Sequence, residues 1–185
     1  MTSATTLPLI VSASDLGPPP VVHQLVQERA VRPVFNDHYL TGRFKDTPKL
    51  RARIAEFFMP PRSAIALESA LWVYAGGPIP HVLSVLLPAR NPPLPQRSKI
   101  RGIRTDFDLT DIAGVDGIAV TTKERTVVDL ARWCDSQTAR EGIRTLAQLG
   151  ADLAQAKSMI GHKRRNCVRA HELVNAVIAG PVAIR

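Results

Sequence analysis

The spacing of hydrophobic and polar residues predicts that the C-terminal part of this chain is almost wholly helical. From residue 122 onward, apolar residues recur every three or four positions, and Gly150 and Gly161 interrupt the pattern. The expected helices cover residues 122–135, 138–149, 151–160 and 163–179. In the first of them an apolar stripe should be buried, and its members are Val127, Val128, Leu130, Ala131 and Cys134.

Shorter elements are predicted at the N-terminal end. Proline is tolerated in the first turn of a helix, so a helix can open at Pro19 or Pro20. Asn36-Asp37 is suitable turn chemistry between two β-type runs. The predicted elements are a loose arm at 1–11, a short helix at 12–16, a helix from Pro19 or Pro20 to about Glu28, and strands at 30–35 and 38–40. A helix followed by a hairpin is the order found in a winged helix-turn-helix.

The middle of the chain mixes helical and β-type patterns. Pro60-Pro61 and Gly76-Gly77 end two helical patterns, and residues 88–102 are rich in proline and basic residues, which favours a loop. The predicted elements are helices at 48–58 and 64–75 and strands at 81–87, 103–107 and 118–120. The fold class is therefore α+β. A small winged-helix-like module is expected at 1–45, and a larger domain with a short sheet and a helical C-terminal half at 46–185.

The stretch 116–133 joins a turn, a strand and a helix. Gly117 permits a tight turn, and Thr121 and Glu124 have the spacing of a capping box. Asp129 lies beside the apolar stripe of the helix, where a carboxylate needs a donor, and Arg125 one turn earlier can supply it. No second carboxylate is placed to share acid–base work, which favours a structural role for Asp129 over a catalytic one.

The charge balance favours a polyanionic partner. The 185 residues include 24 Lys and Arg against 16 Asp and Glu, a net charge of +8, with a sequence pI of about 10.2. Such a balance suits phosphate neutralisation, so nucleic acid is a better candidate than a membrane. No apolar run approaches the roughly 20 residues of a spanning helix, and the run 7–11 lacks a basic leader. Two cysteines indicate a reduced compartment, so we expect a cytoplasmic protein.

Three groups of residues are candidates for contact with a partner. The predicted helix and hairpin offer base-reading and phosphate-binding side chains. In the middle loop, alternation along a β-type run is expected to put cations on one face. The last helix opens with cations that oppose its dipole unless an anion neutralises them. The DNA-binding candidates are His23, Gln24, Gln27, Arg29, Arg32, Asn36 and Arg43. Candidates for a protein partner or nucleic acid are Arg97, Lys99, Arg101, Arg104, Lys163, Arg164, Arg165 and Arg169. For each group, a solvated polar surface is the alternative.

Catalytic and metal-binding patterns are weak. His162, Cys167 and His171 lack the second ligand pair of a structural zinc site. The aspartates at 106, 108, 111 and 116 suggest a metal-dependent nuclease only distantly, because they lie among turn residues, where aspartate is favoured for local hydrogen bonds. No nucleotide-binding loop or nucleophile motif is present. We therefore expect no catalytic residue, metal or cofactor, and the nuclease remains a minor alternative.

In this order the motifs resemble the AbiEi family of antitoxins, the regulatory members of type IV toxin–antitoxin operons, especially those of actinobacteria. The strongest match is Asp116-Gly-Ile-Ala-Val-Thr-Thr followed by Arg125-Thr-Val-Val-Asp-Leu-Ala131. Weaker matches are Ser69-Ala-Leu-Trp72, the strand ending at Pro88 and the basic stretch 97–104. Together they cover residues 20 to 135.

This resemblance implies a DNA-binding autorepressor that neutralises a nucleotidyltransferase-like toxin, with double-stranded DNA of its own promoter and the toxin as partners. The family usually has about thirty residues before its recognition helix, whereas 17 residues precede the Pro18-Pro-Pro run here. An interaction-only antitoxin with a decayed DNA-binding module is therefore the alternative.

Overall fold

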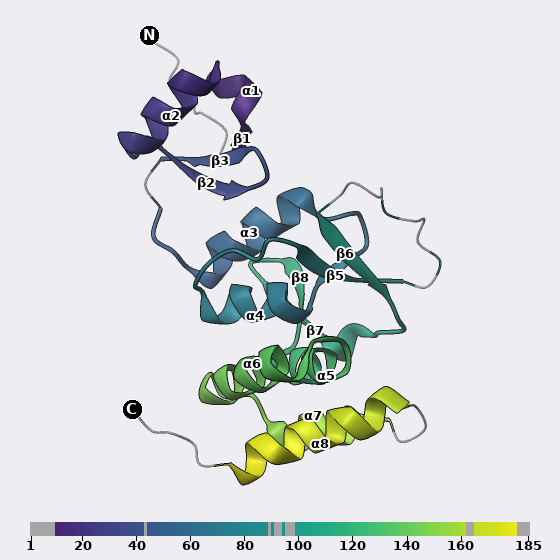
Figure 1. The fold of residues 1–185 in the computed structure, drawn as a ribbon. Coiled ribbons are helices and arrows are strands. Elements are labelled where there is room, and N and C mark those ends of the chain that lie inside the picture. The colour runs from purple at the N-terminus through teal and green to yellow at the C-terminus, as the bar shows by residue number, and fades with distance from the viewer. Residues whose placement is uncertain are drawn as a thin grey trace. The chain divides into compact units, whose positions relative to one another are not determined.

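The computed structural model describes residues 10–42, 44–88, 90, 94, 99–161 and 165–180 (Figure 1). The chain divides into two compact units, Met1–Asp46 and Thr47–Arg185. The fold is α+β, as the sequence predicts. The division falls one residue after the boundary expected from the sequence.

The first unit is a three-stranded antiparallel sheet with two helices. Its elements are β1 (Ile10–Ser12), α1 (Ala13–Leu16), α2 (Pro19–Gln27), β2 (Val31–Phe35) and β3 (His38–Thr41). The strand order is β1-β3-β2, so β3 lies in the centre of the sheet. Leu40 of β3 is 1% exposed, and Val22 of α2 is also buried, so the helix packs its apolar side against the sheet. The backbone N–H of Ala13 donates to the carbonyl of Asp37 and ties α1 to the hairpin turn.

One expectation for this unit is wrong. The predicted loose arm includes Ile10 and Val11, which instead begin β1 and pair with Leu40 and Tyr39 of β3. A three-residue strand has almost no periodic signal of its own, because its hydrogen bonds come from a partner about thirty residues away. Residues 1–9 of the arm lie outside the described residues.

The second unit is built on a five-stranded mixed sheet. Its strands are β4 (Ala64–Ile65), β5 (Leu83–Leu87), β6 (Ile100–Arg104), β7 (Ile112–Val115) and β8 (Ile118–Thr121), in the order β6-β5-β4-β8-β7. The central pairs are β4 antiparallel to β5 and β4 parallel to β8. All five residues of β5 are buried, as predicted for a strand covered on both faces.

Two boundaries in this sheet differ from the sequence prediction. The helix expected from residue 64 begins at residue 67, because Ala64 and Ile65 pair with β5 and β8. The strand expected at 103–107 covers Ile100–Arg104 and runs parallel to β5. In both places the tertiary pairing decides the element, since a run of two to five residues carries a weak local preference.

The helices of the second unit cover the sheet in layers. They are α3 (Pro48–Phe58), α4 (Leu67–Ala75), α5 (Lys123–Trp133), α6 (Ser136–Gln148), α7 (Leu153–Met159) and α8 (Arg165–Ala179), with a short 3-10 turn, η1, at Leu109–Asp111. Figure 1 shows α5 and α6 beside the sheet and α7 and α8 outside them. The predicted stripe from Val127 to Cys134 is buried in the core between these helices. Helix α3 has the predicted bounds, and the side chain of Thr47 caps it by accepting from the N–H of Leu50.

The start of α5 differs by one residue from the expected capping box. Thr122, rather than Thr121, is the N-cap, and its side chain accepts from the N–H of Arg125. The hydroxyl of Thr121 is buried and lies 2.8 Å from that of Thr126. Glu124 accepts instead from the N–H of Asp152, so it connects α5 to the start of α7.

Candidate nucleic-acid interface

Helix α2 presents a polar outer face in the first unit. Val22 faces the sheet and is buried, whereas His23, Gln24 and Gln27 are exposed. The side-chain amide of Gln24 donates to the carboxylate of Glu28 at 2.8 Å. Amide side chains can read adenine edges in the major groove, but α2 has no lysine or arginine between its first and last residues.

The cations of this unit lie just beyond α2. Arg29 adopts a left-handed backbone conformation, with φ 57°, and its N–H donates to the carbonyl of Val26. Arg32 is exposed on β2, and Asn36, with φ 51°, forms the turn between β2 and β3. Arg43 lies outside the described residues. Arg29 and Arg32 therefore stand near the carboxyl end of α2, on backbone fixed by a turn and a sheet.

A basic hollow of about 530 Å³ opens between the end of α2 and the sheet. Apolar side chains and three cations line it, and none of its lining residues is acidic. The lining residues are Val26, Arg29, Val31, Arg32, Pro33, Leu40, Gly42, Phe44 and Lys45. Such a surface fits an anion with an apolar portion.

Lys45 and Phe44 were not among the sequence candidates. No local sequence pattern singles them out; they come shortly after Gly42, which follows β3 and has a φ of 82°. A Cβ at Gly42 would lie 3.2 Å from the Phe44 ring, so glycine permits this close approach. Phe44 is 49% exposed, which leaves an aromatic surface beside the cations.

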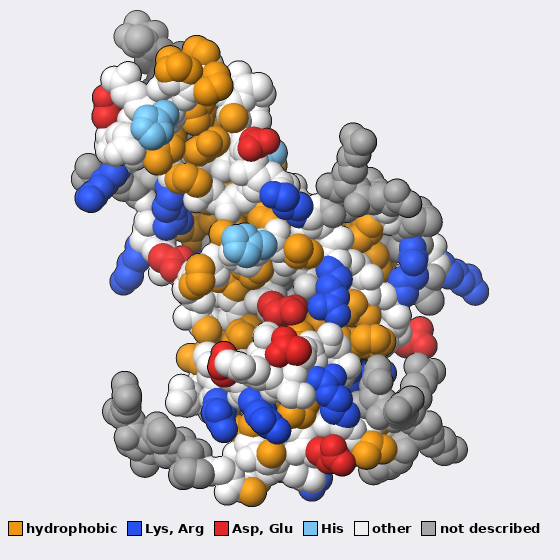
Figure 2. Space-filling view, in the orientation of Figure 1, with side chains coloured by type: hydrophobic (Ala, Val, Ile, Leu, Met, Phe, Trp, Pro, Cys, Tyr) orange, Lys and Arg blue, Asp and Glu red, His pale blue; other side chains and the backbone are white. Residues whose placement is uncertain are grey.

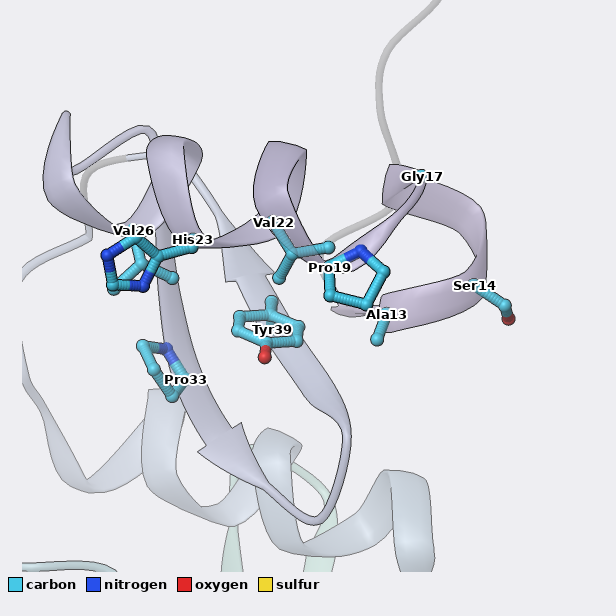
Figure 3. Close-up of a pocket in the computed structure, with 9 residues that line it drawn as sticks. All are labelled: Ala13, Ser14, Gly17, Pro19, Val22, His23, Val26, Pro33 and Tyr39. Atoms are coloured by element: carbon cyan, nitrogen blue, oxygen red, sulfur yellow. The ribbon is translucent and has the colours of Figure 1, made fainter.

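A second, apolar groove of about 590 Å³ runs along the other end of α2 (Figure 3). Pro19, Val22 and Val26 of the helix lie on one side of it, and Tyr39 and Pro33 of the hairpin lie on the other. His23 is at its margin, and the groove contains no carboxylate or thiol. Within the part of the chain that the structure describes, no group of three or more histidine, cysteine or acidic residues is placed to hold a metal ion.

The basic residues predicted in the middle loop do not share one face. Arg97 lies outside the described residues, Lys99 is exposed, and Arg101 and Arg104 belong to β6. Three positions separate these two arginines, so they project from opposite faces of the strand, and the predicted single cationic face is wrong. Arg101 is engaged internally, since it donates to the carbonyl of Trp133 at 2.9 Å and lies 3.6 Å from the carboxylate of Glu68.

The C-terminal basic group is only partly described. Lys163 and Arg164 lie outside the described residues, and Arg165 begins α8, where its side chain is not described. Arg169 donates to the carbonyl of Cys134 at 2.6 Å. It thus satisfies a carbonyl at the end of α5, which gives this arginine a structural use beside the one predicted.

The carboxylate of Asp129 is completely buried in the second unit. Arg125 Nε donates to it at 3.0 Å and 3.2 Å, which confirms the predicted partner. The expectation that no second carboxylate lies at this site is wrong, because Asp111 also accepts from Arg125, whose Nη1 donates to it at 2.6 Å. Burial raises the pKa of Asp129 to about 6, and the Arg125 guanidinium opposes that rise. One arginine therefore joins η1 and the centre of α5.

The surface is mixed in character. On the face drawn in Figure 2, lysine and arginine side chains are scattered among acidic and hydrophobic ones and do not form one large patch. Among the described residues, no helix combines the length and apolar character needed to cross a bilayer.

Comparison with known proteins supports the fold alone. No model of a known protein family matches the chain, and no curated protein matches it. In fold the chain is similar to the solved structure of the RV2827C protein from Mycobacterium tuberculosis, with a TM-score of 0.50 and 14% sequence identity. The alignment covers 92% of this chain and 72% of that chain.

Proposed function

We propose that this protein is a DNA-binding antitoxin of the type IV class, which represses its own promoter and counters a nucleotidyltransferase-like toxin. It acts by binding, in the cytoplasm, and carries out no catalytic step. The proposal combines the architecture of the first unit with the family resemblance of the motif Asp116–Ala131.

The arrangement around α2 is the observation that carries the DNA-binding part. Two helices, α1 and α2, are separated by Gly17 and Pro18, and a hairpin follows them. Short helix–turn–helix pairs with a glycine in the turn are typical of DNA-binding modules, whose second helix enters the major groove. The third strand, β1, pairs with β3 and completes a small sheet of the kind that supports a wing. These features support a winged-helix interpretation of the first unit.

Electrostatics supply the attraction. The chain carries a net charge of +8, and Arg29, Arg32 and Lys45 line one hollow at the end of α2. Cations at that position can bind the phosphates that flank a helix in the major groove, while Gln24 and Gln27 face the base edges.

The antitoxin part depends on the second unit. Its support is the resemblance of the β8–α5 junction, where Thr122 caps α5 and Arg125 joins two aspartates. This junction is a packing element, so the residues that contact a toxin are expected on the surface around it.

The test is binding of the full-length protein to a duplex of its own promoter, measured by gel retardation and by anisotropy at several salt concentrations. We expect the affinity to fall about tenfold or more between low and physiological salt, because several phosphates are neutralised. Arg29→Ala and Arg32→Ala should weaken binding without a change in melting temperature. No retardation at low salt would contradict the DNA-binding part of the proposal.

An interaction-only antitoxin is the second candidate. It is favoured by one observation, the absence of cations within α2, whose Gln24 is bound to Glu28. Rescue of cells from the toxin without any promoter binding would favour this candidate.

A further inference from the structure

The five-stranded sheet ends in two edge strands of different chemistry. β6 carries Arg101 and Arg104, and charged side chains on an edge oppose pairing with another strand. β7, the other edge, reads Ile-Ala-Gly-Val and carries no charge. None of its residues is fully buried, and Gly114 is exposed. An uncharged, accessible edge of this kind is a template for a further strand.

The hairpin geometry shows which backbone groups β7 offers. Val115 pairs with Ile118 across the turn Asp116-Gly117, and both turn residues have positive φ, 55° and 82°. This is a two-residue hairpin, whose closing pair exchanges hydrogen bonds. Bonded and non-bonded pairs alternate along an antiparallel ladder, so the next pair, formed by Gly114, is non-bonded. The N–H and C=O of Gly114 therefore point away from β8.

A hydrogen bond at the far end of the hairpin supports the same alternation. The N–H of Thr122 donates to the carbonyl of Asp111 at 2.8 Å, three pairs from Gly114. The N–H of Ile112 donates to the carbonyl of Leu109. By the same alternation, the C=O of Ile112 points away from β8. Within the described part of the chain, neither backbone group of Gly114 has a partner. A Cβ built on Gly114 would meet nothing within 4 Å, so the sheet face at this residue has room for a side chain.

We propose that β7 pairs antiparallel with β7 of a second copy of this chain, across a two-fold axis at Gly114. One residue supplies both the donor and the acceptor, so each Gly114 N–H donates to the Gly114 carbonyl of the other copy. Symmetric contacts of this kind need no sequence from outside the chain. In this register Ala113 lies opposite Val115 of the second copy, so apolar side chains meet.

Charge at the ends of the strand does not oppose this pairing strongly. Asp116, which follows β7, already lies 2.9 Å from Arg53 and 3.8 Å from Lys49. Leu109, three positions before β7, is 89% exposed and adds apolar surface near the edge. A contact of four residues a side buries less surface than the roughly 1,200–2,000 Å² of a stable interface. The dimer is therefore weak.

The test is the mass of the full-length protein in solution without DNA, measured by sedimentation from about 1 µM to a few hundred µM, the range of a weak complex. We expect the average mass to rise toward that of a dimer. Gly114→Lys should keep the protein monomeric, because like charges then face each other across the axis. The matched control is Gly161→Lys, which places the same side chain in equally open space on a loop and should dimerise as the wild type does.

A second variant and a hydrogen-exchange measurement test the proposal even if Gly114→Lys does not fold. Gly114→Pro removes the outward N–H without breaking a bond to β8, which an edge strand tolerates, and should weaken the dimer at least tenfold. Hydrogen exchange at the Gly114 amide should slow as wild-type concentration rises.

Three results would overturn the proposal. They are a wild type that stays monomeric at the highest concentration, a folded Gly114→Lys variant that dimerises normally, and a dimer in which Gly114 exchange does not depend on concentration. Because no DNA is present, none of these results bears on promoter binding.

Discussion

At the scale of single residues, Asp129 has the most unusual environment. Its carboxyl group is fully buried, accepts the Nε–H of Arg125 at both oxygens and shares that guanidinium with Asp111. Asp129→Ala removes both acceptors and leaves Arg125 partly unsatisfied. We expect a loss of about 1–3 kcal/mol in unfolding free energy, measured by denaturant titration.

Asp106→Ala is the control for this change, because Asp106 is an exposed aspartate outside the helices, and it should leave the melting temperature unchanged. An Asp129→Ala variant with wild-type stability that fails to neutralise the toxin would contradict the structural role.

Asp129 should also make stability depend on pH. Burial raises its pKa to about 6 from an ordinary value of 3.8, so the folded protein binds this proton more tightly than the unfolded chain does. The part of the stability that comes from this proton is therefore complete below about pH 4 and is lost as the pH rises through 6. The expected difference between pH 4 and pH 7 is on the order of 2–3 kcal/mol.

Other groups titrate in the same range, so the measurement compares the wild type with Asp129→Asn at each pH. Asparagine keeps the shape and cannot ionise there. The melting temperature of the wild type, measured relative to that of Asp129→Asn, should fall between pH 4 and pH 7. A constant difference would show that Asp129 does not titrate in this window.

At the scale of elements, β6 packs tightly against its neighbours at Gly102. A Cβ at this position would lie 2.5 Å from Leu87 Cδ1 and 2.7 Å from Leu94 Cδ1. Leu87 is 1% exposed, so it has little room to adopt another rotamer. Gly102→Ala should therefore cost about 1–2 kcal/mol in stability, measured by thermal unfolding. Gly114→Ala in the opposite edge strand has open space and is the matched control, which should unfold at the wild-type temperature or above it.

The basic hollow is a second feature of element scale. If Lys45 binds a phosphate, Lys45→Ala should weaken binding to all sequences equally and lower the salt slope by about 1. Gln27→Ala should instead reduce discrimination between operator and unrelated DNA, because Gln27 faces the base edges in the proposed complex. Anisotropy titrations against both duplexes at four salt concentrations separate these effects. An unchanged slope for Lys45→Ala would place the phosphates elsewhere.

At the scale of the whole molecule, the two units are expected to carry separable activities. The second unit has its own core, which includes the buried helices around α5. A fragment of residues 47–185 should fold, show a cooperative melting transition, lose promoter binding and keep toxin neutralisation. Full-length protein with Arg29→Ala and Arg32→Ala is the companion variant, since it should lose the same activity without a missing unit. Promoter binding by the fragment alone would assign DNA recognition to the second unit.

The sequence by itself determined the elements that depend on neighbouring residues. Helix α3 has the predicted bounds because Thr47, Pro48 and the prolines after Phe58 act within one turn of its ends. Helix α2 and the hairpin after it were predicted for the same reason, since proline and Asn36-Asp37 restrict the backbone locally. The partnership of Arg125 with Asp129 was also predictable, because residues four positions apart share a helix face.

Only the tertiary structure decided the elements whose bonds are distant in sequence. β1, β4 and β7 are two to four residues long and become strands through partners such as β3, β5 and β8. Arg125 reaches Asp111 from 14 positions away, and Lys45 joins Arg29 around a hollow that no local pattern indicates. Local rules govern which residues can form a helix or a turn. The pairing of short strands and the meeting of distant charges depend on how the whole chain packs, because only packing brings those groups within bonding distance.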